Sequence, residues 1–404
     1  MELLFWLPGF VAAALAFLLP FPAGLAAVIV LAPVSNAYVA AGAMGILLLR
    51  WLWADLPGIA ASRTAVAWAW GIGGYIVLGL ALSALTSSNL LRLATESAQW
   101  MLGAGMFIAT VLSMGPELRR TIVRALAASA VLIAATQAAL WLSGWTADES
   151  SSIPMLTWPN NYVSILGLFG LVVLPNVYPD SISAKWRLPL LVIAIAAMFF
   201  NQSRAALLLS ALVLAGWMIL RRRNPAWIVP IAGLMLAVMA GALIVAVRGA
   251  LADPAGVASL GDFQTNYSNL ERLGILIYAW ELFVMFPFGS GIGSSSDLFI
   301  NNPYTVGAYP DAHNMLAMLA VELGWLGVIG YAALAFFLAR QALSGLVHWN
   351  PVLLFAAALL LTTIYDALLF NGILAAYFWI YLAVLVAPPA AGRLVHLVMY
   401  PAKA

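Results

Sequence analysis

The stretch Tyr309-Pro310-Asp311-Ala312-His313-Asn314 closes a polar segment, residues 248–313, that interrupts a nearly continuous series of apolar runs. The chain has 404 residues, of which 65% are hydrophobic and 8% are charged. Soluble domains carry roughly 25% charged residues. The sequence therefore predicts an all-α polytopic membrane protein, in which residues 1–404 form one transmembrane domain and residues 248–313 form a long loop.

A membrane-spanning helix needs roughly 20 mainly apolar residues, which predicts about twelve spans. The first run follows Glu2 and lacks a small-residue cleavage site, so we expect a retained helix. The second run is too long for one straight crossing, and we expect a kink or a re-entrant break near Pro33-Val34-Ser35-Asn36. The predicted spans are approximately 3–19, 23–53, 65–86, 98–115, 121–143, 161–178, 187–201, 204–220, 227–247, 314–339, 351–369 and 372–388.

The 17 Lys and Arg residues predict the orientation, because basic residues favour cytoplasmic loops. With a cytoplasmic N-terminus, most of them lie inside, and only Arg92, Arg204, Arg248 and Arg272 lie outside. We therefore predict that both termini are cytoplasmic. The net charge of +2 is too small to indicate a nucleic-acid partner. The basic residues predicted to lie inside are Arg50, Arg63, Arg119, Arg120, Arg124, Lys185, Arg187, Arg221, Arg222, Arg223, Arg340, Arg393 and Lys403.

The long outer loop contains an apolar run over residues 271–286, interrupted by Glu281 and ended by Pro287. We predict a helix that lies along the outer leaflet or dips into it, because a crossing would invert everything downstream. The following residues 288–294 predict a Gly/Ser turn that returns the chain to the membrane. A dinucleotide-type phosphate cradle is the less favoured interpretation, because it needs a preceding strand.

His313 is the one histidine on the predicted outer side, and it is a candidate general base because imidazole exchanges a proton near neutral pH. The alternative is an interfacial histidine at a helix end. At about 100° per residue, the small residues Ala317, Ala320, Gly324 and Gly327 share its helical face. That face predicts close helix packing or a groove for a lipid chain. Glu322 points to the opposite face, and the candidate supporting residues are Tyr309, Asp311 and Asn314.

Two of the outer arginines are candidate diphosphate ligands. Arg204 lies in a tight turn between two spans, and Arg272 begins the loop helix. A guanidinium stays charged and offers a planar fork of donors, which suits a phosphate. The alternative is that both anchor helices at headgroup level or pair with nearby carboxylates. Arg92 and Arg248 are expected to be ordinary interface anchors.

Asp366 lies about one turn inside the outer end of the predicted span 351–369. An ionisable group at that depth usually has a partner, and we expect one of the outer arginines, with a polar helix-end network as the alternative. The chain has no cysteine, so disulfides and thiolate ligands are excluded. With no Asp-x-Asp pair and a lone outer histidine, we expect neither a metal nor another cofactor.

Three segments in this order resemble the superfamily of O-antigen ligases, O-antigen polymerases and bacterial O-oligosaccharyltransferases. They are Asn201-Gln-Ser-Arg-Ala-Ala-Leu-Leu-Leu, Glu271-Arg-Leu-Gly-Ile through Phe286-Pro-Phe-Gly-Ser-Gly-Ile-Gly, and Ala312-His-Asn-Met-Leu through Glu322-Leu-Gly-Trp-Leu-Gly. Each segment is short and degenerate, but the ordered set covers roughly the second half of the chain.

This resemblance implies a metal-independent membrane glycosyltransferase, similar in plan to C-type glycosyltransferases, in the bacterial inner membrane with a periplasmic site. The implied donor is an undecaprenyl-diphosphate-linked O-antigen, and the implied acceptor of a ligase is lipid A–core. By position, Arg204 and Arg272 would bind the diphosphate and His313 would activate the acceptor hydroxyl. The absence of a large soluble C-terminal domain favours a ligase over the protein-glycosylating relatives.

Three other functions stay open from the sequence. A polymerase would extend the glycan on its own carrier lipid and shares the matched motifs. A lipid-glycan transporter would also be apolar, but transporters tend to place polar groups at the membrane midplane. A non-catalytic scaffold would tolerate joint replacement of the histidine and both arginines.

Overall fold

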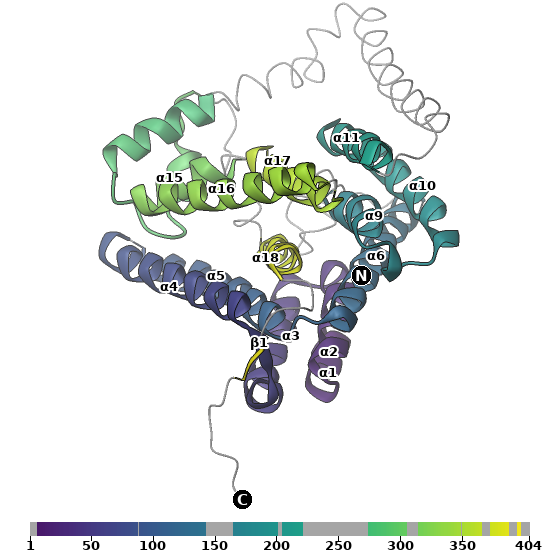
Figure 1. Cartoon of the computed structure of the whole chain (residues 1–404). Helices are drawn as coiled ribbons and strands as arrows, with labels where there is room; N and C mark the ends of the chain where they lie inside the picture. Colours follow the sequence, from purple (N-terminus) through teal and green to yellow (C-terminus); the bar gives the residue numbers. More distant parts are fainter. Residues whose placement is uncertain are drawn as a thin grey trace, which may run out of the picture.

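A computed structural model (Figure 1) describes residues 6–87, 89–142, 165–200, 204–220, 274–304, 314–348, 350–365, 372–387 and 394–396. Almost all of these residues lie in helices, as the composition predicts. The described strands, β1 (Ala60–Ser62) and β2 (Leu394–His396), form one short antiparallel pair in which Ala60 pairs with His396. This pair brings the connection after residue 55 and the C-terminal segment to one end of the helical bundle.

The N-terminal helices form two sharp turns. α1 (Trp6–Leu18) is followed by α2 (Phe21–Leu31), a 3-10 turn over Ala32–Val34, and α3 (Ala37–Arg50), which continues as a π-helical turn over Trp51–Asp55. The rings of Phe21 and Trp51 lie 6.2 Å apart, so the start of α2 lies beside the end of α3. α2 and α3 therefore run antiparallel. The predicted break near Pro33 is confirmed, and the prediction of one crossing over residues 23–53 is wrong.

Proline and an N-cap residue explain this break. Pro33 lies in the 3-10 turn, where its ring cannot continue the helix, and Ser35 is extended with φ −113° and ψ 162°. The side chain of Asn36 then accepts a hydrogen bond from the Tyr38 backbone N–H at 3.0 Å and starts α3. Two short antiparallel helices consequently replace one long kinked helix.

Three long helices follow: α4 (Arg63–Thr86), α5 (Leu90–Leu112) and α6 (Pro116–Leu142). Ser62 and Asn89 cap α4 and α5 by accepting backbone N–H groups at 3.1 Å. After residue 164 the chain forms a π-helical segment (Gly167–Val173), α9 (Leu174–Val177), a 3-10 turn (Pro179–Ser181), α10 (Ala184–Phe200) and α11 (Arg204–Leu220).

The C-terminal half contains the Gly274–Met285 helix and α14 (Ser295–Ile300), both within the predicted outer loop. The next helices are α15 (Met315–Leu323), α16 (Trp325–Val347), α17 (Val352–Tyr365) and α18 (Gly372–Val386). The predicted helix over residues 271–286 is confirmed for residues 274–285. The rest of the polar segment, residues 248–273 and 305–313, lies outside the described residues.

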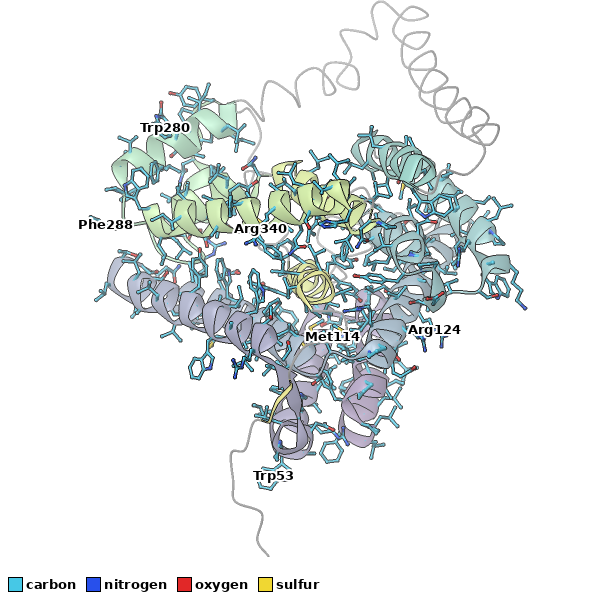
Figure 2. The ribbon with its side chains drawn as sticks, in the orientation of Figure 1. Trp53, Met114, Arg124, Trp280, Phe288 and Arg340 are labelled. Carbon is cyan, nitrogen blue, oxygen red and sulfur yellow. The ribbon has the colours of Figure 1, made fainter. Side chains whose placement is uncertain are left out.

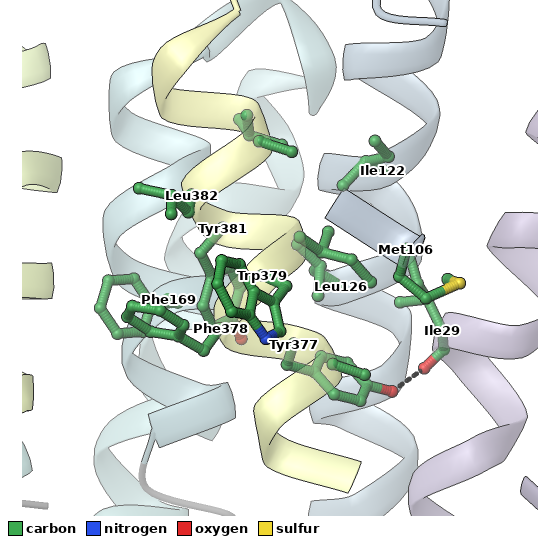
Figure 3. Close-up of a cluster of buried hydrophobic side chains, with 14 of the residues drawn as sticks. Ile29, Met106, Ile122, Leu126, Phe169, Tyr377, Phe378, Trp379, Tyr381 and Leu382 are labelled. Atoms are coloured by element: carbon green, nitrogen blue, oxygen red, sulfur yellow. Dashed lines mark hydrogen bonds between the residues drawn. The ribbon is translucent and has the colours of Figure 1, made fainter. Parts of the chain in front are cut away.

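α18 is the central helix of the bundle (Figure 1), and its described side chains from Ala375 to Leu385 are all buried. A helix that is apolar all round can be buried in protein on every face, as α18 is. Trp379 packs edge-on against Phe107 of α5, and Tyr381 stacks on Phe169 with ring centroids 4.6 Å apart (Figure 3). The Tyr377 hydroxyl donates a hydrogen bond to the carbonyl oxygen of Ile29. α18 thereby joins the N-terminal helices to the middle of the chain.

Four helices of the described chain are long and apolar enough to cross a membrane: Ala37–Asp55, Arg63–Thr86, Pro116–Ala139 and Trp325–Val347. Shorter apolar helices accompany them, among them Trp6–Leu18, Gly167–Val177 and Ala375–Val386. The chain is therefore an all-α membrane protein. The predicted number of about twelve spans stays a prediction.

Many of the basic residues that were predicted to lie in cytoplasmic loops gather at one end of the bundle. Arg119 donates to the carbonyl of Ala387 at 3.0 Å, and Arg124 donates to that of Ser181 at 2.7 Å. Trp51, beside Arg50, donates to the Ser113 hydroxyl at 2.9 Å. We call this the basic end. Figure 2 shows Arg124 on one side of the bundle and Phe288 on the other.

The fold-back of α2 changes the expected position of the N-terminus. Phe21 and Trp51 both lie at the basic end, and a Cβ atom on Gly9 would lie 2.2 Å from the Ser35 hydroxyl, at the opposite end of α3. α1 therefore runs toward the basic end. The start of α1 thus lies at the end of the bundle opposite to Arg50, which differs from the expectation that the two lie on one side. The prediction that both termini are cytoplasmic stays a prediction.

Candidate functional site

Most of the predicted site residues lie outside the described residues. These are Tyr309, Asp311, His313, Arg272 and Asp366. Arg204 is the first residue of α11, and its side chain is not described. Whether His313, Arg272 and Arg204 converge therefore stays a prediction. Asn314 is the predicted supporting residue whose contacts the structure describes.

Asn314 is the N-cap of α15. Its side-chain oxygen accepts a hydrogen bond from the backbone N–H of Ala317 at 3.0 Å. Asparagine is among the best N-cap residues, because its short side chain satisfies a backbone donor that the first helical turn leaves free. Asn314 thus sets where α15 begins, directly after His313 in the sequence.

Gly324 divides the predicted span 314–339 into two helices, so the prediction of one straight helix there is wrong. Its φ of +57° is a left-handed conformation that ends α15 and starts α16. The helices fold back on each other, because a Cβ atom on Gly327 would lie 2.0 Å from the carbonyl oxygen of Leu319. Of the predicted small-residue face, Gly327 lies in the contact between α15 and α16.

Residues 287–294, which we call the glycine turn, lie against the tip of this helical hairpin. The backbone N–H groups of Ser290 and Gly291 donate to the carbonyl oxygens of Val321 and Glu322, each at 3.0 Å. In return, Trp325 donates its N–H to the Pro287 carbonyl at 2.9 Å. Carbonyl groups at the end of α15 are thereby satisfied by the turn. The predicted turn is confirmed, and a helix rather than a strand precedes it.

The glycine turn also contacts the connection between α4 and α5. The Ile292 N–H donates to the buried Ser83 hydroxyl at 3.0 Å, and a Cβ atom on Gly293 would lie 2.7 Å from Cγ of Glu96. Arg92 forms an ion pair with Asp297 of α14. Arg92 is therefore more than the expected interface anchor, because it joins α5 to the outer loop. This pair is partly exposed and contributes about 0–1 kcal/mol.

Glu322, near the end of α15, is the buried carboxyl group of this region, with 2% of its surface exposed. Its Oε1 accepts a hydrogen bond from the Ser295 hydroxyl at 2.5 Å, and its Oε2 has no hydrogen-bond partner. Burial raises the pKa of Glu322 to about 8 and the Glu96 carboxylate adds to the rise, whereas the Ser295 hydroxyl and the backbone N–H groups of Gly293 and Ser295 lower it. Sequence analysis missed this residue, although an acidic residue within an apolar run was an available signal.

An apolar cavity of about 250 Å³ lies beside α15, between α4, α5, α16 and α18. Its walls include Met315 and Leu319, so it begins near the N-terminal turn of α15. The cavity can accept apolar groups, because its polar surface is small. The other lining residues are Trp68, Gly71, Ile72, Tyr75, Trp100, Gly330, Tyr331, Ala333, Leu334, Phe378, Trp379 and Leu382.

A second cavity of about 340 Å³, with more polar groups in its wall, lies between the glycine turn, α14 and the α4–α5 connection. Ser87, Asn89, Ser290 and Ser294 supply hydroxyl and amide groups to its wall. Among the described residues, no group of three or more His, Asp or Glu side chains could hold a metal ion.

The Gly274–Met285 helix packs on α15. Ile275, Ala279 and Leu282 form one buried cluster with Ala317, Met318, Val321 and Phe299. The Tyr304 hydroxyl donates to Glu281 Oε1 at 2.6 Å and holds the later part of the loop on this helix. The helices that follow Arg272 and His313 in sequence therefore pack on each other.

Comparison with known proteins gives a match to a protein family. Residues 189–332 match a family model described as O-Antigen ligase. This segment covers the ordered motifs from Arg204 to Gly327. Neither the curated proteins nor the solved structures contain a match to the chain.

Proposed function

We propose that the chain, of which residues 189–332 match a family model described as O-Antigen ligase, is a ligase of that superfamily. It would transfer a glycan from undecaprenyl diphosphate to a lipid A–core acceptor. The transfer would take place at the periplasmic face of the bacterial inner membrane. The family match supports a membrane glycosyltransferase, and the donor, the acceptor and the residue roles are parts of the proposal.

The packing of the Gly274–Met285 helix on α15 is the observation that carries the proposal. Arg272 lies three residues before Ile275, and His313 lies four residues before Ala317. Ile275 and Ala317 belong to the same buried cluster. Arg272, which would bind the diphosphate, and His313, which would act as the general base, precede the starts of these two helices. Both would therefore face one substrate.

The proposed reaction is an inverting displacement. His313 takes the proton from an acceptor hydroxyl, and the hydroxyl oxygen forms a bond to the anomeric carbon of the donor. The bond between that carbon and the diphosphate oxygen breaks, and its electron pair leaves with undecaprenyl diphosphate. General-base catalysis of this kind contributes about 10²–10⁴-fold to the rate.

Arg204 and Arg272 would stabilise the charge that grows on the departing diphosphate. Fixed positive charges act most strongly in a partly dehydrated site. Arg204 begins α11, whereas Arg187 near the start of α10 donates to the Pro179 carbonyl at the basic end. Since α10 separates the two arginines, the proposal expects Arg204 at the end of the bundle away from the basic residues.

The apolar cavity beside Met315 would receive part of the polyprenyl chain of the donor. Its volume of about 250 Å³ suits a segment of that chain rather than the whole lipid. Each buried CH₂ group contributes about 0.8 kcal/mol to such binding. The cavity would hold the lipid while the diphosphate remains near the start of α15.

Purified protein in detergent tests the function, with lipid-linked glycan supplied alone or together with lipid A–core. A ligase makes a glycan–core product and releases undecaprenyl diphosphate only when the acceptor is present. A polymerase makes a ladder from the lipid-linked glycan alone. A transporter makes neither product, and that result would contradict the proposal.

A further inference from the structure

Glu322 lies where three parts of the chain meet, and the proposed reaction does not use it. Its own backbone carbonyl accepts from Gly291 of the glycine turn, and its side chain accepts from Ser295 at the start of α14. Gly293, between these two residues, packs against Glu96 of α5. One side chain thus connects α15 with the outer loop beside α5.

The surroundings of Glu322 favour a neutral carboxyl group. No basic side chain among the described residues forms an ion pair with it, and its buried Oε2 has no hydrogen-bond partner. The C-terminal end of a helix carries partial negative charge, which disfavours an ionised carboxylate there. The charged and titratable groups around it are Glu96 and Arg92 on α5 and Asp297 on α14, and Arg92 is already paired with Asp297.

We propose that Glu322, in its protonated form, is a positioning residue that holds α15 against the glycine turn and α14. α15 lines the apolar cavity through Met315 and Leu319. Loss of the proton would place an unpaired charge in this buried junction and loosen α15. The effect on transfer rests on the proposed function, whereas the effect on the junction does not.

The direction of the pH effect follows from the raised pKa of Glu322, about 8 because of burial. A carboxyl group whose pKa is higher in the folded protein stabilises the fold at low pH, and this stability is lost as the pH rises through the folded pKa. Above that pH, the neutral fraction falls roughly tenfold for each pH unit. The melting temperature should therefore decline as the pH rises from the ordinary Glu value of 4.5 to about 8 and level off above it, whereas transfer, which needs the protonated form, should decline between about pH 8 and pH 9.

The experiment compares wild type with Glu322→Gln, Ser295→Ala and the control Glu117→Gln. Gln keeps the shape of the Glu side chain and remains neutral. The transfer rate of Glu322→Gln should therefore change by less than about twofold between pH 7 and pH 9. Ser295→Ala removes a hydrogen bond that lowers the pKa of Glu322. The pH at which transfer by this variant falls to half should therefore be higher than in wild type. Glu117 is exposed on α6 and pairs with Arg120, so its variant should follow wild type.

Melting temperature and transfer are measured on the purified full chain from pH 6 to pH 9.5. If melting temperature and transfer fall with rising pH as steeply in Glu322→Gln as in wild type, the proposal is overturned. Melting temperature and transfer that do not change with pH in wild type would also overturn it. The melting profile needs no substrate. If wild type transfers no glycan, but its melting temperature still falls with rising pH and that of Glu322→Gln does not, the proposed function fails and the role of Glu322 stands.

Discussion

Gly324 lies so close to Pro287 that a Cβ atom at position 324 would be 2.2 Å from the Pro287 carbonyl oxygen. The left-handed φ of +57° at Gly324 adds a second restriction. Gly324→Ala should destabilise the protein by about 1–3 kcal/mol, because it adds backbone strain and a steric clash. The measurement is thermal unfolding of the purified protein in detergent.

Gly42 provides the control for this substitution. It lies on an exposed face of α3, and a Cβ atom there would contact nothing within 4 Å. Gly42→Ala should stabilise by about 0.5–1 kcal/mol, because alanine favours a helix interior. Equal melting temperatures for the two alanine variants would contradict the close packing of the hairpin tip on the glycine turn.

Ala333→Trp tests the apolar cavity as a lipid site. Ala333 lines the cavity, whereas its neighbour Ala332 does not. A bulky ring at 333 should exclude part of the polyprenyl chain. Exclusion of two CH₂ groups, at about 0.8 kcal/mol each, should raise the KM for the lipid-linked donor roughly tenfold.

The matched variant Ala332→Trp adds the same ring on the outside of α16. It should leave the KM for the lipid-linked donor close to that of wild type. If both variants raise KM equally, or neither does, the cavity is not the lipid site.

Arg204→Lys and Arg272→Lys test the proposed diphosphate ligands. Lysine keeps the positive charge but loses the planar fork of donors. Each variant should lower kcat, by roughly tenfold or more, because the loss of one charge-assisted hydrogen bond costs about 1.5–3 kcal/mol. A kcat equal to that of wild type in both lysine variants would argue against bidentate binding of the diphosphate. Arg63→Lys, at the basic end, is the control and should keep the kcat of wild type.

Single cysteines can establish the orientation, because the natural chain contains none. Since α1 runs toward the basic end, Glu2→Cys and Asn301→Cys should react with a membrane-impermeant maleimide in intact cells stripped of their outer membrane. Glu117→Cys, at the basic end, should react only after the inner membrane is opened. Labelling of Glu2→Cys only after opening would support the prediction of a cytoplasmic N-terminus.

Local signals in the sequence predicted several helix boundaries well. Pro33 and Asn36 marked the break between α2 and α3, and Asn314 marked the start of α15. These positions depend on proline geometry and on N-capping, which involve only neighbouring residues. Hydropathy alone could not tell that the chain folds back at these breaks, because an apolar run has the same composition in one long helix and in two short ones.

The contacts that build the site are non-local and were harder to predict. Arg92 appeared to be an isolated interface anchor, and its pairing with Asp297 joins residues far apart in sequence. Glu322 was assigned only to the face opposite His313, because helical periodicity cannot show that the glycine turn covers it. The central position of α18 was hidden for the same reason, since a buried helix and a lipid-facing helix are both apolar.

The acceptor-dependent transfer assay on His313→Ala tests the central claim most directly. The variant should insert and melt like wild type but transfer about 10²–10⁴-fold less glycan to lipid A–core, because it lacks the general base. His348→Ala, on the exposed residue that follows α16, is the matched control and should transfer normally. Near-normal transfer by a folded His313→Ala protein would contradict the proposed catalytic role.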